Sequence, residues 1–550
     1  MKKKTILFKP NHIRASFSGD MRVLDLASEN NVRINQPCGG NGTCGKCRIK
    51  IKDASTVPTD RERLLLTQNE LKTNIRLACQ TLAEDGMIIY TRNQRADILK
   101  MLGFSTKIDK GNLLPEVCME NLEKQFDTTA AGGVYGIALD IGTTTLAASL
   151  VNLDTGETVA NTDASNPQSA YGDDVISRIS FAVQSPENVA RLQAVVIAAV
   201  NKMIAELLEK ARVEKERVFH LIAGGNTTME HLFMGEDVAS IGAYPFTPKF
   251  YKFPRKRAAD LSLTIRPDAY VDLMPNISGF VGGDITAGIY YTDIANKNIS
   301  SFLIDLGTNS EMVFASKNNI SVCSAAAGPA LEGARIRCGM RAERGAIDKV
   351  RIAPNGTIEI NTIGGPPPCG FCGSGLVDLI AELRRTGIIT ANGAFANNGA
   401  GAAWRSLRTR ISQREYGKEI YIADGENGSI VLTQRDIREV QLAKSAIASG
   451  LEMLLEAHAL PLSKVDRLYL AGAFGNYLDN RSTLELGILP EIDEVKITIA
   501  GNTAGLGCVK ALLSRTCWEE IGAFLARTTH IELATSPNFQ QRFVANMQFR

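Results

Sequence analysis

Long apolar runs, net charge and aromatic side chains are all scarce in this sequence of 550 residues. No run of eighteen apolar residues occurs, so no membrane-spanning helix is expected. The basic start MKKKTILFKP is not followed by the apolar core of a signal peptide. Net charge is +2 and aromatic residues make up 6%, so no surface for nucleic acid is indicated. We expect a cytoplasmic protein without membrane or nucleic-acid partners.

The length indicates the number of domains, and the cysteine count raises the question of what state the thiols are in. A chain of 550 residues is long enough for three or four domains of ordinary size. Its eleven cysteines, in a cytoplasmic protein, are expected to be thiols, metal ligands or redox groups rather than disulfides.

Three cysteines fall within the glycine-rich stretch PCGGNGTCGKCR, residues 37–48. Their spacing is Cys38-x5-Cys44-x2-Cys47, and Cys79 follows later in RLACQ. The plant-type [2Fe–2S] pattern is C-x4-C-x2-C with a distant fourth cysteine; the longer first gap here is similar to that of adrenodoxin-like ferredoxins. Glycine permits the backbone angles that direct N–H groups at sulfur. We therefore expect the four cysteines to hold a [2Fe–2S] cluster, a one-electron carrier.

The residues around the cysteines predict a small α/β domain. A hairpin, a helix and a returning strand are expected at 4–8 with 12–17, at 21–32 and at 76–90. This order resembles the β-grasp fold of a ferredoxin, over residues 1–92. The alternative is a zinc site, but zinc prefers two C-x2-C pairs or Cys/His pairs. Only one such cysteine pair is present, with His12 the one nearby histidine.

A second part of the chain begins after residues 93–133, a mixed polar stretch expected to be a linker with a helix at 115–126. In VYGIALDIGTTTLAASLVNLDTGE an apolar strand ends at Asp140, a turn follows, and a second strand runs to Leu153. A turn of glycine and hydroxyl residues offers N–H and O–H groups to phosphate, and the aspartate offers oxygen to Mg²⁺. The phosphate-binding candidates in this turn are Gly142, Thr143, Thr144 and Thr145.

The same design recurs in SFLIDLGTNSEMVFA, residues 301–315. Here the strand ends at Asp305, and the turn supplies Gly307, Thr308 and Asn309. Two further pairs match in the same order: strand-turn-helix segments at 218–232 and 465–479, and small-residue helices at 279–293 and 499–513. Three pairs in one order predict two similar α/β lobes, about 134–299 and 300–550, facing each other across a nucleotide cleft.

This arrangement resembles the superfamily of actin, sugar and acetate kinases and the seventy-kilodalton heat-shock chaperones. The resemblance implies an ATPase in which the turns after Asp140 and Asp305 are the phosphate loops for ATP and Mg²⁺. It implies that LYLAGAFGN is the adenosine motif, with Gly472, Gly475 and Asn476 near the nucleoside. It implies that GGDITAG and GNTAGLG are connecting helices at the hinge, with Asp284 orienting the attacking water. The expected fold is α/β and multidomain: a β-grasp ferredoxin domain and a two-lobed, ribonuclease H-like ATPase domain at 134–550.

The fusion of the two parts resembles the reductive activators of corrinoid proteins over nearly the whole chain. The motifs that carry this resemblance are CGGNGTCGKC…RLAC, LDIGTTT, LIAGGNTTMEHL, IDLGTNSE, AAAGPALEGARI and GFCGSGLVD. It implies an ATP-hydrolysing enzyme that passes one electron from the cluster to the cob(II)alamin of a corrinoid methyl-carrier protein and restores cob(I)alamin. It also implies a low-potential electron donor, a homodimer and a place in anaerobic methyltransferase systems.

Three other functions compete with this one. A small-molecule kinase of the same fold, with a redox sensor attached, would need a sugar or carboxylate pocket. An ATP-coupled electron donor to a radical enzyme would resemble the ATPase core, but such activators hold a [4Fe–4S] cluster between two subunits. A redox adaptor with an inactive ATPase fold is disfavoured by the intact pair Asp140 and Asp305.

Some features outside these motifs are assigned structural roles. The pair Cys369 and Cys372 lies between GGPPP and GSGL, an unlikely redox context, and is expected in a structural loop. The stretch 336–354 is rich in arginine and lysine; it is large enough for a docking patch, but such stretches are more often solvated faces. The Gly/Ala-rich stretch 392–403 is expected to be a loop.

Overall fold

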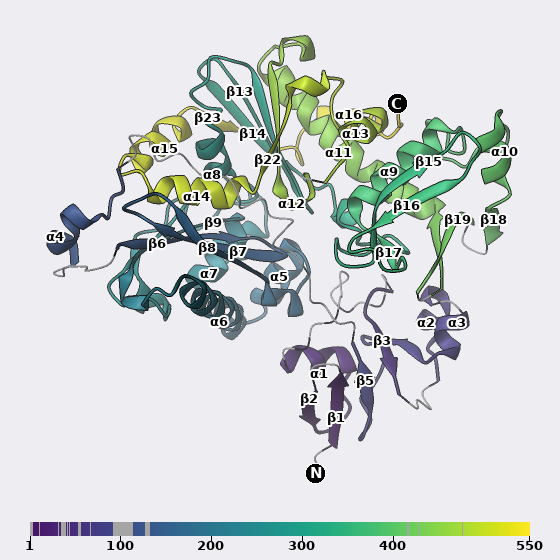
Figure 1. Cartoon of the computed structure of the whole chain (residues 1–550), viewed down its shortest axis with the longest axis horizontal. Helices are drawn as coiled ribbons and strands as arrows, with labels where there is room; N and C mark the ends of the chain where they lie inside the picture. The colour runs from purple at the N-terminus through teal and green to yellow at the C-terminus, as the bar shows by residue number, and fades with distance from the viewer. Residues whose placement is uncertain are drawn as a thin grey trace.

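The computed structural model describes residues 4–9, 12–30, 32, 34, 40, 42, 45–52, 57–66, 68–91, 114–126, 133–414, 417–426, 428–475 and 477–550. A small N-terminal domain lies beneath a larger body made of two lobes and a further α/β extension (Figure 1). In the part of the chain so described, no helix is long and apolar enough to cross a membrane.

The N-terminal domain is a five-stranded sheet with short helices, in the strand order β2-β1-β5-β3-β4. Strands β1 and β2 form the predicted antiparallel hairpin, and β1 pairs in parallel with β5. The expected single strand at 76–90 is wrong: two short strands occur there, separated by a turn that contains Cys79. The bounds are β1 Lys4–Lys9, β2 Ile13–Phe17, α1 Val23–Glu29, β3 Arg48–Ile51, α2 Asp60–Leu65, α3 Gln68–Lys72, β4 Ile75–Leu77 and β5 Ile88–Tyr90.

The linker contains a shorter helix than expected. A 3-10 turn, η2 (Met119–Asn121), leads into α4 (Leu122–Phe126). Arg255 of the larger body holds the start of this segment, because its guanidinium donates to both carboxylate oxygens of Glu116, at 2.6 and 2.8 Å. The linker therefore joins the larger body at a fixed point.

The two lobes repeat one topology, as the paired motifs predict. In the first lobe the strand order is β10-β11-β9-β6-β7-β8, and in the second it is β22-β21-β12-β13-β14-β23. In each lobe the first three strands along the chain are antiparallel neighbours: β6, β7 and β8 in one, and β12, β13 and β14 in the other. Strand β9 then pairs in parallel with β6, and β21 with β12. The bounds are β6 Tyr135–Ile141, β7 Thr145–Asn152, β8 Thr158–Ser165, β9 Val218–Gly225, β10 Lys256–Arg257, β11 Tyr270–Leu273, β12 Ser301–Leu306, β13 Ser310–Ser316, β14 Asn319–Ala325, β21 Arg467–Ala471, β22 Ile497–Gly501 and β23 Thr528–His530.

The two small-residue helices lie against each other between the lobes. They are α8 (Gly283–Thr292) and α14 (Thr503–Leu512), each following the parallel strands of its own lobe. A Cβ at Gly507 would stand 2.2 Å from the carbonyl oxygen of Ala287. Glycine is required at that point because the two helix backbones approach so closely. The predicted pair of connecting helices is confirmed.

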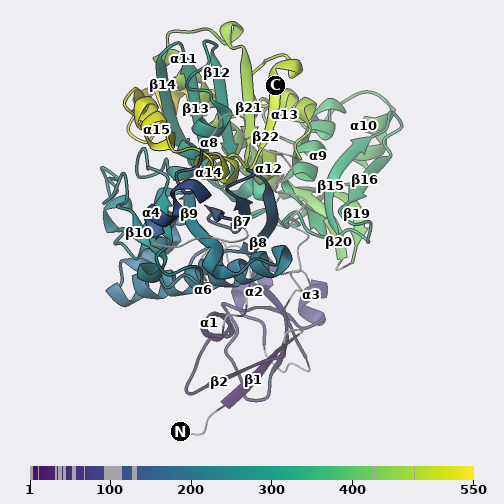
Figure 2. The same cartoon turned by 60° about the vertical axis from the view of Figure 1, so that its left-hand side comes forward.

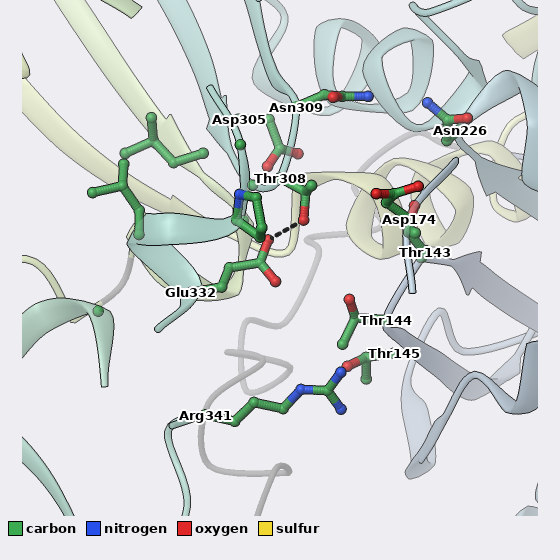
Figure 3. A pocket seen from close by; sticks show the side chains of 18 of the residues that line it. Thr143, Thr144, Thr145, Asp174, Asn226, Asp305, Thr308, Asn309, Glu332 and Arg341 are labelled. Atoms are coloured by element: carbon green, nitrogen blue, oxygen red, sulfur yellow. Dashed lines mark hydrogen bonds between the residues drawn. The ribbon is translucent and has the colours of Figure 1, made fainter. Parts of the chain in front are cut away.

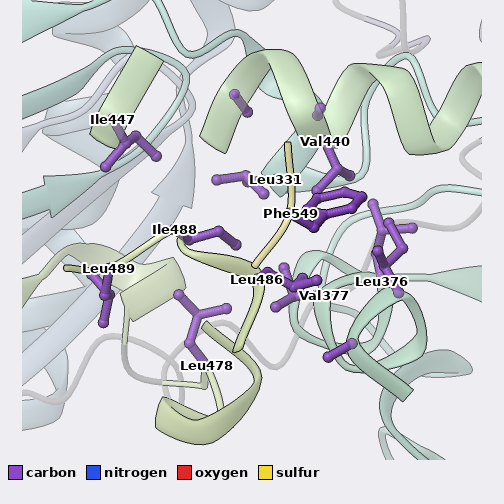
Figure 4. Close-up of a cluster of buried hydrophobic side chains, with 14 of the residues drawn as sticks. Leu331, Leu376, Val377, Val440, Ile447, Leu478, Leu486, Ile488, Leu489 and Phe549 are labelled. Atoms are coloured by element: carbon purple, nitrogen blue, oxygen red, sulfur yellow. The ribbon is translucent and has the colours of Figure 1, made fainter. Parts of the chain in front are cut away.

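The other helices of the first lobe, and α11 of the second, cover the sheet faces turned away from α8 and α14, whereas α15 shares the core cluster of those two helices (Figures 1 and 2). The helices of the first lobe are α5 Val175–Ala182, α6 Pro186–Ala211 and α7 Thr227–Met234; those of the second are α11 Gln434–Ala457, α12 Gly472–Gly475, α13 Asn480–Leu486, α15 Cys517–Leu525 and α16 Pro537–Ala545. The core of the second lobe includes Phe549, whose ring lies among Val440, Leu376 and Val377 (Figure 4). The end of the chain thus closes that core.

An extension interrupts the second lobe between β14 and α11. It holds two three-stranded sheets, in the orders β16-β15-β17 and β18-β19-β20. Its elements are β15 Ala346–Ile352, β16 Ile358–Thr362, β17 Gly370–Phe371, α9 Gly373–Arg385, α10 Ala402–Arg408, β18 Ile411–Arg414, β19 Gly417–Gly425 and β20 Gly428–Thr433. No motif in the sequence predicted these sheets, and part of the basic stretch 336–354 forms strand β15.

Candidate nucleotide site and iron–sulfur site

A cavity of about 530 Å³ lies where the two lobes face each other. It brings together the predicted groups of both lobes, as Figure 3 shows for several of them. The predicted residues in its wall are Asp140, Gly142, Thr143, Thr144, Thr145, Asp284, Asp305, Gly307, Thr308, Asn309 and Gly472. Gly475 is buried but does not line the cavity, and Asn476 lies outside the described residues.

The first predicted phosphate loop is the tip between β6 and β7. A Cβ at Gly142 would meet the carbonyl oxygen of Thr145 at 2.5 Å, so only glycine closes this turn. Asn166 donates to the Gly142 carbonyl at 2.9 Å. Arg178, from α5, is fully buried and donates to the Thr143 carbonyl at 2.5 Å. The carbonyls of Gly142 and Thr143 are therefore held from behind, and Gly142, Thr143, Thr144 and Thr145 line the cavity.

The second predicted phosphate loop is the tip between β12 and β13. Thr308 donates its hydroxyl to Glu332 at 2.8 Å, and Glu332 belongs to the 3-10 turn η7 (Pro329–Glu332). Glu311, two residues past the tip, is buried and accepts from Ser324 at 3.2 Å. Both glutamates line the cavity, and neither was a sequence candidate.

The aspartates of the cavity are half-buried and close enough to repel one another. Burial raises the pKa of Asp140, Asp284 and Asp305 to about 7. Mutual repulsion adds to each rise, whereas a hydrogen bond from Asn502 opposes it at Asp140. Carboxylate oxygens are the ligands that Mg²⁺ prefers, and a divalent cation relieves repulsion among neighbouring acids. The donor set in this cavity therefore fits Mg²⁺.

Asp284 and Asn502 occupy matching places at the hinge. Asp284 lies in the first turn of α8, where its carboxylate accepts the Ile285 N–H at 2.8 Å. Asn502 caps α14 by accepting the Gly505 N–H at 2.8 Å. Each helix start thus directs one polar side chain to the cavity wall.

The cluster site is described in part. Cys47 and Cys79 are both buried, and their Sγ atoms lie 3.3 Å apart, too far for a disulfide bond. Glycines 40, 42 and 45 all have positive φ angles, of 82°, 70° and 66°, as a loop folded around a cluster requires. Two buried thiols brought together by such a loop fit a [2Fe–2S] cluster. Cys38 and Cys44 lie outside the described residues.

The sequence motifs did not single out Glu311, Glu332 or Asn502 of the cavity wall, or Arg178 behind the first turn. Asn502 lies in the predicted GNTAGLG motif, and its position before a helix is a typical N-cap signal that could have singled it out. Glu332 lies in the motif AAAGPALEGARI, which was given no role in the site, and Arg178 had no signal. A single arginine on an amphipathic helix usually lies at the surface, so burial of Arg178 follows only from the tertiary structure. The wall also includes Cys372, whose segment was expected to be a structural loop.

Two lobes of repeated topology, with phosphate-loop candidates on both sides of an acid-lined cavity, define an ATPase fold of the actin and sugar-kinase type, here joined to a ferredoxin-like domain. Three family models match the chain: the C-terminal domain of RACo, the ASKHA domain, at 300–550; the RACo middle region at 135–297; and a 2Fe-2S iron-sulfur cluster binding domain at 8–84.

The relatives of the chain agree with these models. The corrinoid activation enzyme RamQ of Eubacterium limosum is 31% identical over 99% of this chain and 99% of its own length. The [Co(II) methylated amine-specific corrinoid protein] reductase of Methanosarcina barkeri is 25% identical over 76% and 77%. A solved structure, the reductive activator for corrinoid, iron-sulfur protein, is 31% identical with a TM-score of 0.69 and covers 99% of this chain and 98% of its own. The chain belongs to the RACo family of corrinoid reductive activators.

Proposed function

We propose that this chain is an ATP-dependent reductive activator. It transfers one electron from a [2Fe–2S] cluster to the cob(II)alamin of a corrinoid methyl-carrier protein and restores cob(I)alamin. The observation that carries the proposal is the combination, in one chain, of the buried pair Cys47 and Cys79 with an acid-lined cavity between two lobes. The full-length relative named a corrinoid activation enzyme supports the choice of acceptor.

The proposed acceptor has a lower reduction potential than the cluster, so the electron transfer is uphill and needs ATP. Plant-type clusters lie near about −400 mV, and for one electron each step of about 59 mV uphill costs a factor of ten. An acceptor of still lower potential would be reduced only in a small fraction of encounters. A cleft that has two arrangements can couple ATP binding and hydrolysis to partner affinity, which makes the cycle directional.

Within the cavity, each lobe contributes its own groups to ATP. The turns of both lobes bind phosphate through Thr143, Thr144, Thr145, Thr308 and Asn309, with Gly142 and Gly307 allowing close approach. Asp140 and Asp305 would hold Mg²⁺, which supplies charge neutralisation at the phosphates. Asp284, at the start of α8, orients the attacking water. Gly472, Gly475 and Asn476 are assigned to the nucleoside end.

The ferredoxin-like part (1–92) and the ATPase part (134–550) act together through the linker at 93–133. Cys38, Cys44, Cys47 and Cys79 would hold the cluster, which supplies a one-electron carrier when bound. The corrinoid protein docks on the ATPase part, and the ferredoxin-like part moves toward it. The 22 residues from 92 to 113 can extend to at most about 75 Å, which limits how far the ferredoxin-like part can move. The same proposal includes a low-potential donor, a homodimer and a cytoplasmic location.

The test mixes the anaerobically purified holoprotein with a cob(II)-corrinoid protein, a low-potential reductant and Mg-ATP. Growth of the cob(I) absorption band only with ATP, repeated over several corrinoid proteins to find the partner, is the expected result. Steady phosphorylation of a small molecule, with no band for any partner, would contradict the proposal and favour the kinase.

A further inference from the structure

The ferredoxin-like domain touches both lobes of the ATPase. Ser28, at the end of α1, lies 3.3 Å from the carbonyl oxygen of Ala170 in the first lobe. Lys46, in the cysteine loop between Cys44 and Cys47, reaches the extension of the second lobe. Figure 2 shows the domain beneath both parts of the larger body. Its docking therefore bridges the two sides of the cleft.

The contact at Lys46 is a built receptor for an ammonium group. Its Nζ donates to the carbonyls of Ile336, of Gly339 at 3.2 Å and of Arg337 at 3.4 Å. The carboxylate of Asp436, at the start of α11, adds negative charge nearby. Three carbonyls converging on one ammonium satisfy all three of its donors. This is more specific than the ion pair of an exposed lysine.

Neighbouring groups hold the receptor in place. The N–H of Arg337 donates to Asp436 at 2.8 Å, and its guanidinium donates to Glu419 at 2.9 Å. The carbonyl of Cys338 accepts the N–H of Phe371, from β17, at 2.8 Å. Because the receptor is tied to α11, β19 and β17, a shift of the segment moves the docking point as a unit.

Both ends of this segment lie in the wall of the nucleotide cavity. Arg335 precedes the receptor, and Arg341 follows it, and both line the cavity. In Figure 3 the guanidinium of Arg341 extends toward the side where Thr144 and Thr145 of the first lobe lie. A guanidinium directed at a phosphate loop suits a phosphate group, which it can bind through two parallel hydrogen bonds.

We infer that the segment Arg335–Arg341 couples nucleotide to the iron–sulfur domain: Arg341 binds a phosphate of the nucleotide, and the same segment carries the receptor for Lys46. Phosphate binding and domain docking then alter each other's affinity by the same factor, because coupling between two binding events is reciprocal. The inference rests on the proposed function in one respect, that the cavity binds ATP. It gives the basic stretch of the sequence a role in docking within the chain.

A double-mutant cycle on the full-length holoprotein tests this coupling. The dissociation constant of a non-hydrolysable ATP analogue with Mg²⁺ is measured for Lys46→Met, Arg341→Gln and the double variant. Lys46→Met is expected to change the constant about fivefold or more, and Arg341→Gln to weaken binding about tenfold or more. In the Arg341→Gln background, Lys46→Met is expected to change nothing further. Exposed Lys50 and Arg344 give the matched controls, Lys50→Met and Arg344→Gln.

Independent effects would overturn the inference: either Lys46→Met leaves the constant unchanged, or its effect is the same with and without Arg341. Arg341→Lys keeps the positive charge and serves as the second variant if Arg341→Gln fails to fold. Small-angle scattering provides a readout apart from nucleotide binding. Lys46→Met is expected to enlarge the radius of gyration, and an unchanged radius would contradict the docking role. If the wild-type protein does not bind the analogue, the proposed function itself fails; if it binds and the cycle is additive, only this inference fails.

Discussion

Asn502 donates a hydrogen bond of 2.7 Å to the carboxylate of Asp140, across 362 positions of sequence. Asn502 caps the connecting helix α14, and Asp140 lies in β6 just before the predicted phosphate loop of the first lobe. One amide thus joins the hinge to the site expected to hold Mg²⁺. A change in the angle between the lobes would therefore alter the contact between Asn502 and Asp140, and through it the nucleotide site.

Replacing Asn502 separates this contact from the helix cap. Asn502→Ser keeps a residue that caps helices well but is too short to reach Asp140. We expect thermal stability to stay close to that of the wild type, while Mg-ATP binds about fivefold or more weakly. Calorimetric titration and thermal unfolding on one preparation measure both. Unchanged nucleotide affinity would show that the hinge contact does not support the site.

Asp284 is expected to act in hydrolysis more than in binding. Asp284→Asn should lower the rate of ATP hydrolysis about a hundredfold or more, the scale of a lost general acid or base. Affinity for a non-hydrolysable analogue should change little. Asp293→Asn, at the other end of α8, is the control. If Asp284→Asn still hydrolyses ATP, another acid must orient the attacking water, and Glu311 of the cavity wall would be the next candidate.

Arg178 is expected to hold the first phosphate loop from behind. Arg178→Met leaves the carbonyls of Thr143 and Gly172 without their donor, at a cost of about 1–3 kcal/mol for each buried group. The expected result is a lower melting temperature together with weaker ATP binding. Arg191→Met, on exposed α6 surface, should leave both unchanged. A stable variant with normal ATP affinity would contradict this role.

Gly507 is expected to set the spacing of the connecting helices. Gly507→Ala places a methyl group against the Ala287 backbone, and overpacking of this kind costs about 1–3 kcal/mol. Gly522→Ala is the control because a Cβ there meets nothing within 4 Å, and alanine is the better helix residue. Thermal unfolding should therefore move in opposite directions for the two variants. An unchanged midpoint for Gly507→Ala would mean that the helices separate freely.

The repeated halves were predictable because each carries its own local signal. An apolar strand, an aspartate and a turn of small residues fix the hairpins at Asp140 and Asp305, and the order of the paired segments then fixes the topology. The extension after β14 carried no comparable repeat, so its sheets were not predicted. The split of the expected strand at 76–90 had a local cause: the chain turns at Cys79 and again at Gly86, which has a φ of 83°.

The sequence pattern could not predict residues whose roles depend on what the fold buries beside them. Arg178, Glu332 and the Lys46 receptor depend on which distant backbone groups come to lie beside them. In the sequence, for instance, Asp436 is an ordinary acid at the start of a helix, and only the fold shows that it accepts the N–H of Arg337. The phosphate-loop threonines and the cluster cysteines were predictable because short sequence motifs carry them.

The most direct test of the account is a single-turnover count of electrons. The holoprotein is reduced, freed of excess reductant, and mixed with a cob(II)-corrinoid protein and Mg-ATP, while cluster oxidation and cob(I) formation are followed together. We predict equal amounts of both, at equal rates, in the wild type. Cys79→Ser should abolish cob(I) formation, and Asp305→Asn should reduce it to the level without ATP. Cob(I) formation that proceeds equally without ATP, or in Cys79→Ser, would contradict the account.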